Sequence, residues 1–416
     1  MRNGFTGCSR SQRDGSGCWS CHNLLWKWQK REFLGKNDIT LNIKETGAFM
    51  KILHLNAGNE TGGGMVHILS LLKGINEKEL ILGLFEDGIF AKKAKELGIR
   101  TVTFSQSSRY DISILFKLKK FIKDEKIDII HTHGARANLF GYIIRLMTGV
   151  TWATTVHSDP RNDFLGRGII GRMFTCLNMA VLKKPDHYFA VSDRFKDMLR
   201  EFNVKGNKIT VIYNGIDFDF STKCKISRED LKLQAEEFVL LMVARFDPVK
   251  RHELAIAAFE QAMGASKEKI RLLFVGEGPE RKRIEALVKD RNLENDVLFM
   301  GQQEEVAPFF QLADITLLTS KTESFPLVLL ESSREGTPAI TTDVGGVRDM
   351  IPDNSYGFIV GETPDSIAAA IQEAICLKAR GQLKTIGKKF RNYTSQRYSV
   401  QSFADSVYNA YKLFVH

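Results

Sequence analysis

The stretch FVLLMVARFDPVKRHELAIAAFEQAMGASKEKIRLLFV, residues 238–275, decides the fold class. It opens with the apolar run Phe238–Val243 and closes with a second apolar run, Ile270–Val275. Between them apolar residues recur at helical spacing, so the stretch predicts strand, helix and strand. Apolar runs without polar alternation are typical of parallel strands covered on both faces, which indicates an α/β fold.

The same alternation continues from Met50 to the C-terminus, interrupted by a turn-rich, charged stretch from about Asn214 to Glu236. We therefore predict two doubly wound parallel-sheet domains of Rossmann-like type, facing each other across a cleft, and a final helix over Ser399–Phe414. The predicted strands are Lys51–Leu55, Glu79–Phe85, Arg100–Phe104, Asp128–Thr132, Thr151–His157, His187–Val191 and Lys208–Ile212, then Phe238–Val243, Ile270–Val275, Asp296–Met300, Ile315–Thr319, Ala339–Thr341 and Gly357–Val360.

The predicted domains are residues 50–225 and 226–395, followed by a C-terminal helical segment, 396–416. Residues 1–49 differ from the rest, because they hold three of the six cysteines and three of the four tryptophans without an apolar period. We interpret them as a disordered or mis-annotated leader, with Met50 as the natural start. Residues 18–22 (CWSCH) match the haem-attachment pattern, but haem attachment requires export and no export signal precedes them.

The formal net charge of +10 favours an anionic partner. No basic stripe is interleaved with aromatic residues, so we predict no nucleic-acid partner. No apolar run reaches the ~18–20 residues of a membrane span, and the scattered cysteines indicate a cytoplasmic protein. Residues 164–184 are apolar but carry Arg167, Arg172, Lys183 and Lys184. They predict either an ordinary covering helix or a helix that lies peripherally on the anionic inner face of the cell membrane.

Residues 319–331 (TSKTESFPLVLLE) follow a predicted strand and open a helix. We predict that Ser324 is the N-cap of this helix and that Pro326 lies in its first turn. The free amides near Phe325 and Leu327, together with the helix dipole, form a candidate anion site.

Two carboxylates, Glu323 and Glu331, bracket this anion site. If both were helical they would lie ~12 Å apart. Paired carboxylates in a double-displacement glycosidase are only ~5–5.5 Å apart, so that pairing is excluded. The spacing suits the two hydroxyl-rich ends of a nucleotide sugar. The alternative is a solvated helix with two unrelated glutamates.

Two cations, Arg245 and Lys250, follow another predicted strand and could neutralise a diphosphate leaving group. The alternative is ordinary surface charge at a turn. Gly276 and Gly278 follow a third strand, where they allow either close approach of a ligand or an ordinary turn.

A run of glycines that includes Gly63 and Gly64 links the first strand to a helix and is a second candidate anion site. His157 ends another predicted strand. His131 and His133 share one face of a further strand. A metal site there lacks a third ligand within reach in the sequence, so we favour packing or polar lining and predict no metal.

Together these residues resemble the family 4 retaining glycosyltransferases of the GT-B fold, over roughly Met50 to the C-terminus. Three positions depart from that family's pattern. Ala244 and Arg251 stand where the family often has glycine, and Val66 stands where it often has an acidic residue. The motifs that carry the resemblance are Gly63-Gly64, the Thr-x-His that ends in His157, residues 213–217 (YNGID), Arg245 with Lys250, Gly276-x-Gly278-Pro279, Glu323-x7-Glu331 and Gly345-Gly346.

The resemblance implies roles for these residues. Arg245 and Lys250 would hold the donor diphosphate, and Glu331 would bind the ribose hydroxyls. Glu323, together with backbone amides near Phe325, would hold hydroxyls of the transferred sugar.

From the other domain, Gly63 and Gly64 would close on the phosphates, and His157 would lie beside the donor sugar. The catalytic set would then be Glu323, His157, Arg245 and Lys250. Ser324, Phe325, Pro326 and Leu327 would line the donor site with Gly276, Gly278 and Glu331. The final helix would cross back onto the first domain.

The implied reaction moves a hexose-type sugar from a UDP- or GDP-linked donor to a hydroxyl acceptor with retention of configuration. It would need no metal and no cofactor besides the nucleotide sugar as co-substrate. Cell-envelope, exopolysaccharide or glycolipid synthesis, with a lipid-linked acceptor as one option, is the expected context. Two alternatives remain open: a nucleotide-sugar epimerase of the same fold, and a nucleotide-binding protein without turnover.

Overall fold

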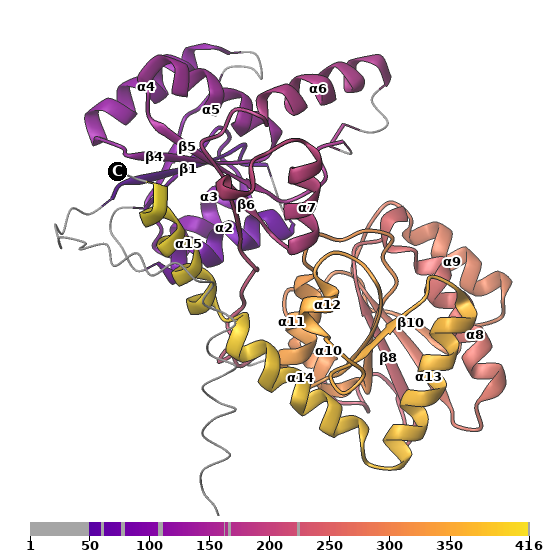
Figure 1. Ribbon diagram of the computed structural model, residues 1–416. Coiled ribbons are helices and arrows are strands. Elements are labelled where there is room, and N and C mark those ends of the chain that lie inside the picture. The colour runs from indigo at the N-terminus through magenta and orange to yellow at the C-terminus, as the bar shows by residue number, and fades with distance from the viewer. Residues whose placement is uncertain are drawn as a thin grey trace, which may run out of the picture. The chain divides into compact units, whose positions relative to one another are not determined.

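The computed structural model describes residues 50–59, 62–75, 80–106, 111–161, 163–164, 168–222 and 225–414. The predicted leader and its CWSCH sequence lie outside the described residues. Within the described part, the chain forms two sheets in which neighbouring strands run parallel (Figure 1). The predicted doubly wound α/β fold is confirmed.

The first sheet has the strand order β3-β2-β1-β4-β5-β6-β7. The helices α2, α3 and α15 cover one face of it, and α4 and α5 cover the other. The strands are β1 (Ile52–Asn56), β2 (Leu80–Leu84), β3 (Thr101–Thr103), β4 (Ile129–His133), β5 (Thr151–Val156), β6 (His187–Ala190) and β7 (Ile209–Val211). The helices of this half are α2 (Gly63–Gly74), α3 (Ile89–Glu96), α4 (Ser113–Glu125), α5 (Ala135–Thr148), α6 (Gly168–Val181), α7 (Asp193–Glu201) and the 3₁₀ turn η1 (Gly206–Lys208).

The second sheet has the order β10-β9-β8-β11-β12-β13. Its strands are β8 (Phe238–Val243), β9 (Ile270–Val275), β10 (Val297–Phe299), β11 (Ile315–Leu318), β12 (Ala339–Thr342) and β13 (Phe358–Val360). The helical elements are η2 (Pro248–Lys250), α8 (His252–Ala265), α9 (Arg281–Asp290), α10 (Ala307–Leu312), α11 (Leu327–Arg334), α12 (Val347–Met350), α13 (Pro364–Ala379), α14 (Leu383–Arg397) and α15 (Val400–Phe414).

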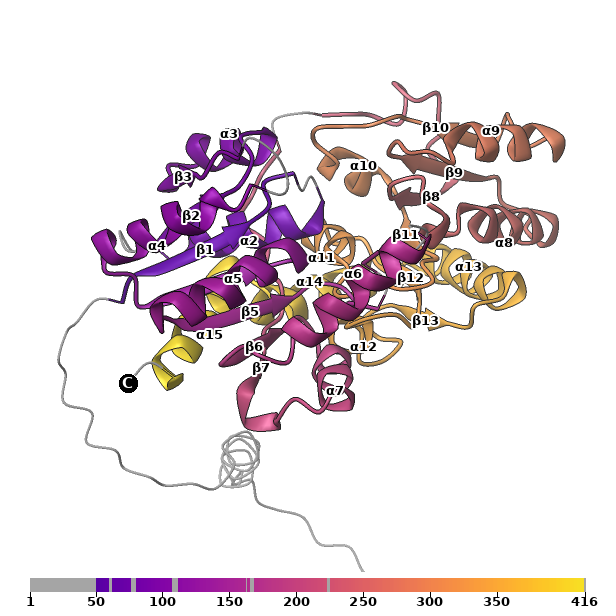
Figure 2. The same cartoon turned by 90° about the horizontal axis from the view of Figure 1, so that it is seen from above.

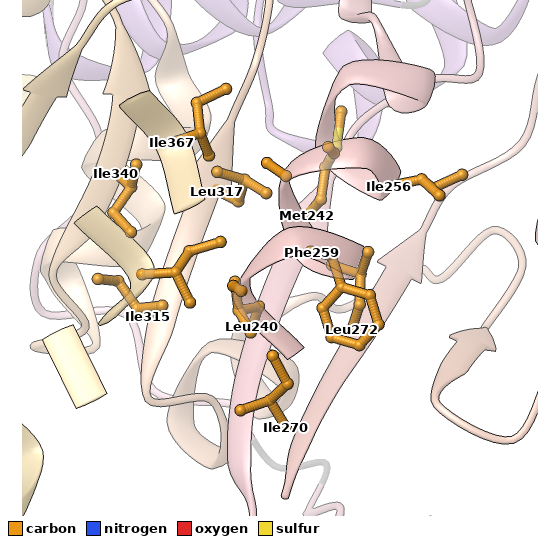
Figure 3. Close-up of a cluster of buried hydrophobic side chains, with 14 of the residues drawn as sticks. Leu240, Met242, Ile256, Phe259, Ile270, Leu272, Ile315, Leu317, Ile340 and Ile367 are labelled. Carbon is orange, nitrogen blue, oxygen red and sulfur yellow. The ribbon is translucent and has the colours of Figure 1, made fainter. Parts of the chain in front are cut away.

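The core of the second half lies between its sheet and the helices α8 and α13, which lie side by side (Figure 2). Leu240 and Met242 of β8 point toward Phe259 of α8, with Ile315 of the neighbouring strand beside them (Figure 3). Leu240, Met242 and Ile315 belong to the apolar runs that predicted the strands, so the residues that form these strands also form the surface on which the helices pack.

Each sheet reverses its winding beside its first strand. The reversal lies between β1 and β4 in the first sheet and between β8 and β11 in the second. In open parallel sheets, ligands bind beyond the carboxyl ends of the strands at such topological switch points. The loops after these strands are therefore where a site is expected.

The predicted strands are all present, and no strand end differs from its prediction by more than one residue. The predicted linker holds one isolated parallel bridge, between Ile216 and Ser399. The last helix, α15, begins beside this bridge and packs against α2 of the first half. A Cβ added to Gly74 would lie 2.8 Å from both Ala404 Cβ and Val400 Cγ1, so glycine permits the close approach of the two helices.

We predict that Gly74→Ala lowers the free energy of unfolding by about 1–3 kcal/mol, because the added methyl overpacks the contact between α2 and α15. The matched control is Gly264→Ala in α8, where an added Cβ would meet no atom within 4 Å. That change should stabilise the fold by roughly 0.5–1 kcal/mol through helix propensity. Urea unfolding measures both, and equal effects of the two substitutions would contradict the tight contact.

Candidate active site

Three loops meet at the carboxyl edge of the second sheet, around its switch point. They follow β8, β9 and β11, and backbone hydrogen bonds connect them. Phe246 N–H donates to Glu277 O at 3.0 Å, and Lys321 N–H donates to Val249 O at 2.8 Å. The predicted donor-binding residues of this half all lie on these loops or on α11, which follows the third.

Gly276 and Gly278 allow the loop after β9 to approach the loop after β8. A Cβ on Gly276 would lie 2.1 Å from Ala244 O, and a Cβ on Gly278 would lie 2.6 Å from Phe246 O. Gly276 also has a φ of +145°, a conformation that residues with a Cβ rarely adopt. The two glycines therefore position the backbone that carries Arg245.

The two predicted phosphate ligands differ in their surroundings. Arg245 is 69% exposed, and its Nε lies 3.2 Å from Asp247 Oδ2. Lys250, at the end of η2, is 23% exposed and forms an ion pair with Glu323. Ser320 Oγ donates to the same carboxylate oxygen at 2.6 Å. The predicted phosphate ligand and the predicted sugar ligand are thus in direct contact.

Arg251 occupies one of the positions where the resembling family often has glycine, and its backbone is left-handed, with φ 53° and ψ 52°. This conformation costs an ordinary residue roughly 1–2 kcal/mol. Its guanidinium donates to Thr319 O at 2.8 Å and Ser320 O at 2.9 Å, and pairs with Glu362 at 2.7 Å. These bonds offset the strain and tie the β8 loop to the β11 loop.

The prediction that Ser324 caps α11 is wrong. The helix begins at Leu327, and its N-cap is Pro326, with φ −72° and ψ 102°. A residue that precedes proline is disfavoured in the helical region, so Phe325 does not continue a helix from Ser324. Glu323 therefore lies outside the helix, and the spacing calculated for two helical carboxylates does not apply.

Phe325 anchors the loop in front of α11. Its buried ring packs between Tyr213 and Tyr398, with centroids 5.4 and 5.3 Å away. Gly345 has a φ of +54°, and a Cβ there would lie 2.5 Å from Ser324 O. These contacts hold the backbone before α11, where the first turn of the helix presents free amides to an anion.

Glu331 lies within α11, and its carboxyl forms no hydrogen bond or ion pair with any described residue. Burial raises the pKa of this carboxyl to about 7, against the opposing effect of Arg334. A half-buried carboxyl without a protein partner is available to hydrogen-bond the hydroxyl groups of a ligand.

At the switch point of the first sheet, α2 begins at Gly63, and Gly62 is its N-cap. A Cβ on Gly62 or Gly63 would meet no atom of the described residues within 4 Å, so packing against that part of the chain does not require glycine there. Gly64 lies in the first turn of the helix. The space at this helix N-terminus is open to an anion. Thr61, which precedes these glycines, lies outside the described residues.

Five histidines gather on the face of the first sheet that α2 and α15 cover: His54, His67, His131, His133 and His157. The sequence analysis identified the last three and missed His54 and His67. The nitrogens of His54, His131 and His133 lie within 4.8 Å of one another, as do those of His67, His133 and His157. The third candidate ligand that is lacking nearby in the sequence is therefore provided by other elements of the fold.

Burial lowers the pKa of all five histidines, to about 3 for His54 and about 4 for His67. At neutral pH the cluster is therefore uncharged. The membership of His54 in this cluster could have been predicted from the alternation of side chains along β1, which places His54 on the same sheet face as Ile52. In the structure His54 pairs with His131 in the register of β1 and β4.

A cavity of about 520 Å³ lies in the first half and includes His157 in its lining. Phe164 and Phe174 contribute to its apolar wall. At its polar side, Asn178 Nδ2 donates to Asp163 Oδ2 at 3.1 Å, and the buried Asn178 Oδ1 has no partner among the described residues. Burial raises the pKa of Asp163. The cavity thus combines an aromatic wall with groups that accept hydrogen bonds.

Comparison with known families decides the identity of the chain. The family described as "Glycosyltransferase Family 4" matches residues 61–220, and the family described as "Glycosyl transferases group 1" matches residues 225–392. The chain is a group 1 glycosyltransferase of the family 4 type. The predicted GT-B fold and the predicted use of a nucleotide sugar agree with this membership, and solved glycosyltransferases share the fold.

Among its relatives, the glycosyltransferase is 29% identical to N-acetyl-alpha-D-glucosaminyl L-malate synthase of Bacillus anthracis, over 76% of this chain and 82% of that one. It is 25% identical to UDP-Gal:alpha-D-GlcNAc-diphosphoundecaprenol alpha-1,3-galactosyltransferase of Escherichia coli, over 72% and 79%. The structure of HepE from Anabaena in complex with UDP has a TM-score of 0.76 at 20% identity, over 88% of this chain and all of that one.

We predict that Glu331→Gln stabilises the fold at pH 8 and has little effect at pH 5. The ordinary pKa of 4.5 applies to the unfolded chain, and burial raises the pKa to about 7 in the fold. Below pH 4.5 the carboxyl is protonated in both states and does not destabilise the fold. The loss of stability grows as the pH rises from 4.5 to 7 and is complete above pH 7. The gain at pH 8 should be on the order of 1–3 kcal/mol in urea unfolding. An equal effect at both pH values would show that the carboxyl ionises normally.

Proposed function

We propose that this glycosyltransferase moves a hexose-type sugar from a UDP-linked donor to a hydroxyl acceptor, with retention of configuration and without a metal ion. The observation that carries the proposal is the arrangement around the N-terminus of α11. There the Lys250–Glu323 pair lies before the helix, and free amides lie in its first turn. The carboxyl of Glu331, which has no partner among the described residues, follows within the helix. This order matches the sugar, diphosphate and ribose of a nucleotide sugar.

The choice of UDP over GDP rests on the relatives. The relative of Escherichia coli carries UDP-Gal in its name, and HepE has been solved with UDP and with UDP-glucose. The same relative is named for a diphosphoundecaprenol acceptor. This name supports our proposal that the chain acts in cell-envelope polysaccharide or glycolipid synthesis.

The proposed chemistry uses positioning and charge. The acceptor hydroxyl attacks the anomeric carbon on the face that the diphosphate leaves, and a phosphate oxygen of the leaving group takes its proton. Arg245, Lys250 and the α11 dipole stabilise the negative charge that develops on the diphosphate. These fixed positive groups supply the charge that a metal ion would otherwise provide. Glu323 and His157 hold the transferred sugar from its two sides.

The cavity beside His157 is our candidate for the acceptor site. Its aromatic wall, with Phe164 and Phe174, suits an apolar portion of the acceptor. Asn178 Oδ1 and Asp163 suit hydroxyl groups, because both accept hydrogen bonds. An acceptor that carries both hydroxyls and an apolar group, such as a lipid-linked saccharide, satisfies both parts.

We further propose that α6 contacts an anionic membrane surface. Ile169 is 85% exposed and Met173 66% exposed on this helix, and the charged Arg172 between them is exposed as well. Apolar side chains beside cations are what an interfacial helix presents to anionic lipid. In the described part of the chain, no helix has the length and apolar character to cross a bilayer.

The donor proposal predicts that UDP and UDP-sugars raise the melting temperature of the full chain, and GDP compounds do not. Ligand at ~100 times its dissociation constant adds ~2.7 kcal/mol. Lys250→Ala should abolish the shift, whereas Lys378→Ala, which removes an ion pair with Asp314 before β11, should keep it.

Transfer assays with and without EDTA, with the product anomer assigned by NMR, test metal independence and retention. Equal shifts with GDP compounds would refute the choice of UDP, and an inverted product would refute retention. Loss of activity in EDTA would refute metal independence.

The membrane proposal predicts that the full chain sediments with vesicles of phosphatidylglycerol and not with vesicles of phosphatidylcholine. The double change Ile169→Asp and Met173→Asp should abolish co-sedimentation, since it places charge on the apolar face of α6. Leu413→Asp, at a side chain of α15 that is 73% exposed, serves as the matched control. Equal loss in both variants, or no sedimentation of the wild type, contradicts a membrane role for α6.

A further inference from the structure

A continuous chain of hydrogen bonds runs through the histidine cluster to His157. His133 Nδ1 lies 3.0 Å from His157 Nε2, and His133 Nε2 lies 3.0 Å from His54 Nδ1. His54 Nε2 is 3.3 Å from the hydroxyl of Tyr411, on α15. That hydroxyl also contacts His131 Nδ1, and His131 Nε2 lies 2.7 Å from Thr155 Oγ1.

Each member of this chain is neutral. All are buried except His157, which is half-exposed. Burial is the largest cause of the lowered pKa of each histidine, and it raises the pKa of Tyr411. A neutral imidazole has one N–H and one bare nitrogen, and a hydroxyl has one proton to donate. Tyr411 could accept from both of its histidine neighbours, but its own buried proton would then have no acceptor among the described residues, which costs about 1–3 kcal/mol. All the hydrogen bonds of the chain therefore point in the same direction, either toward His157 or away from it.

Thr155 decides that direction. Among the described residues, His131 is the hydrogen-bond partner of its buried hydroxyl. If His131 donated to Thr155, the hydroxyl proton would be buried without an acceptor, which costs about 1–3 kcal/mol. If Thr155 donates to His131 Nε2, every proton from Thr155 to His133 has an acceptor, and the proton left without a described acceptor belongs to His157, which is half-exposed and lines the cavity. An unfilled lone pair on the hydroxyl is the smaller penalty.

The direction can then be followed residue by residue. His131 donates from Nδ1 to the Tyr411 oxygen, and Tyr411 donates its proton to His54 Nε2. His54 donates from Nδ1 to His133 Nε2, and His133 donates from Nδ1 to His157 Nε2. The proton of His157 therefore lies on Nδ1, which has no hydrogen-bond partner among the described residues and belongs to a side chain that lines the cavity.

We propose that this chain, from Thr155 through His131, Tyr411, His54 and His133, holds His157 as its Nδ1–H tautomer and so makes it a hydrogen-bond donor toward the nucleotide sugar. His133 and Tyr411 are then positioning residues for His157. The role toward the sugar rests on the proposed function, whereas the tautomer is a property of the ligand-free protein.

The hydrogen bonds also oppose metal binding at the group formed by His54, His131 and His133. The nitrogens of His54, His131 and His133 already serve as donors or acceptors in the chain. In the described part, the bonds to His54 and His133 come from neutral groups, so a buried divalent ion between them would be uncompensated. His67 lies outside the chain, because its Nδ1 bonds to Asn214 and its buried Nε2 has no described partner.

The test is ¹⁵N NMR of the full chain with ring-labelled histidine, without ligand and at pH 7. The chain has nine histidines, so the spectrum is sparse, and His157→Gln assigns the decisive signals by their loss. We expect His54, His131, His133 and His157 all to be protonated on Nδ1 and bare on Nε2. A protonated or metal-bound Nε2 of His157, or an equal mixture of its tautomers, would overturn the proposal, even if donor binding is normal.

Tyr411→Phe removes the middle of the chain without touching His157. We expect a mixture of His157 tautomers and a kcat on the order of tenfold lower, with little change in the KM for the UDP-sugar. Tyr142→Phe is the matched control, since Tyr142 packs against Trp152 on the opposite face of the sheet. A His157 spectrum unchanged by Tyr411→Phe would overturn the proposal. Failure of UDP-sugars to bind the wild type would refute the donor instead and leave the tautomer result standing.

Discussion

The approach of two backbone segments at Gly276 and Gly278 is the constraint on which the proposed donor half of the site depends. Their missing side chains let the loop after β9 lie against Ala244 and Phe246, at distances that a Cβ would not allow. The loop after β8 is thereby held, and Arg251 joins it to the loop after β11 through hydrogen bonds to backbone oxygens. The ion pair of Lys250 with Glu323 joins the first of these loops to the third.

The two halves of the site differ in their electrostatics. Around α11 the groups are charged and partly exposed, as in the Lys250–Glu323 pair, and they suit the diphosphate of a donor. Around His157 the groups are buried and neutral, so orientation of protons rather than net charge determines what a ligand meets. In the proposed donor complex, charge would hold the phosphates and directed hydrogen bonds would hold the sugar.

Much of the fold could be predicted because buried parallel strands are short apolar runs. Such runs are recognisable in the sequence, as at Phe238–Val243. The start of α11 could not be predicted from capping preference, since the restriction before Pro326 outweighs the tendency of Ser324 to cap. The Lys250–Glu323 pair and the histidine chain join residues far apart in the sequence. The sheet face of His54 could have been predicted from the alternation of side chains along its strand, but nothing in the sequence indicates its contact with Tyr411.

The position of Tyr411 in the last helix has a consequence for biosynthesis. The first half of the chain leaves the ribosome well before α15, and domains generally fold in the order of synthesis. Until α15 is made, one face of the first sheet lacks its cover, and His54 and His131 lack the hydroxyl that joins them. The first half therefore reaches its native state only after the second half has been translated, and completion of the polypeptide controls maturation of the site.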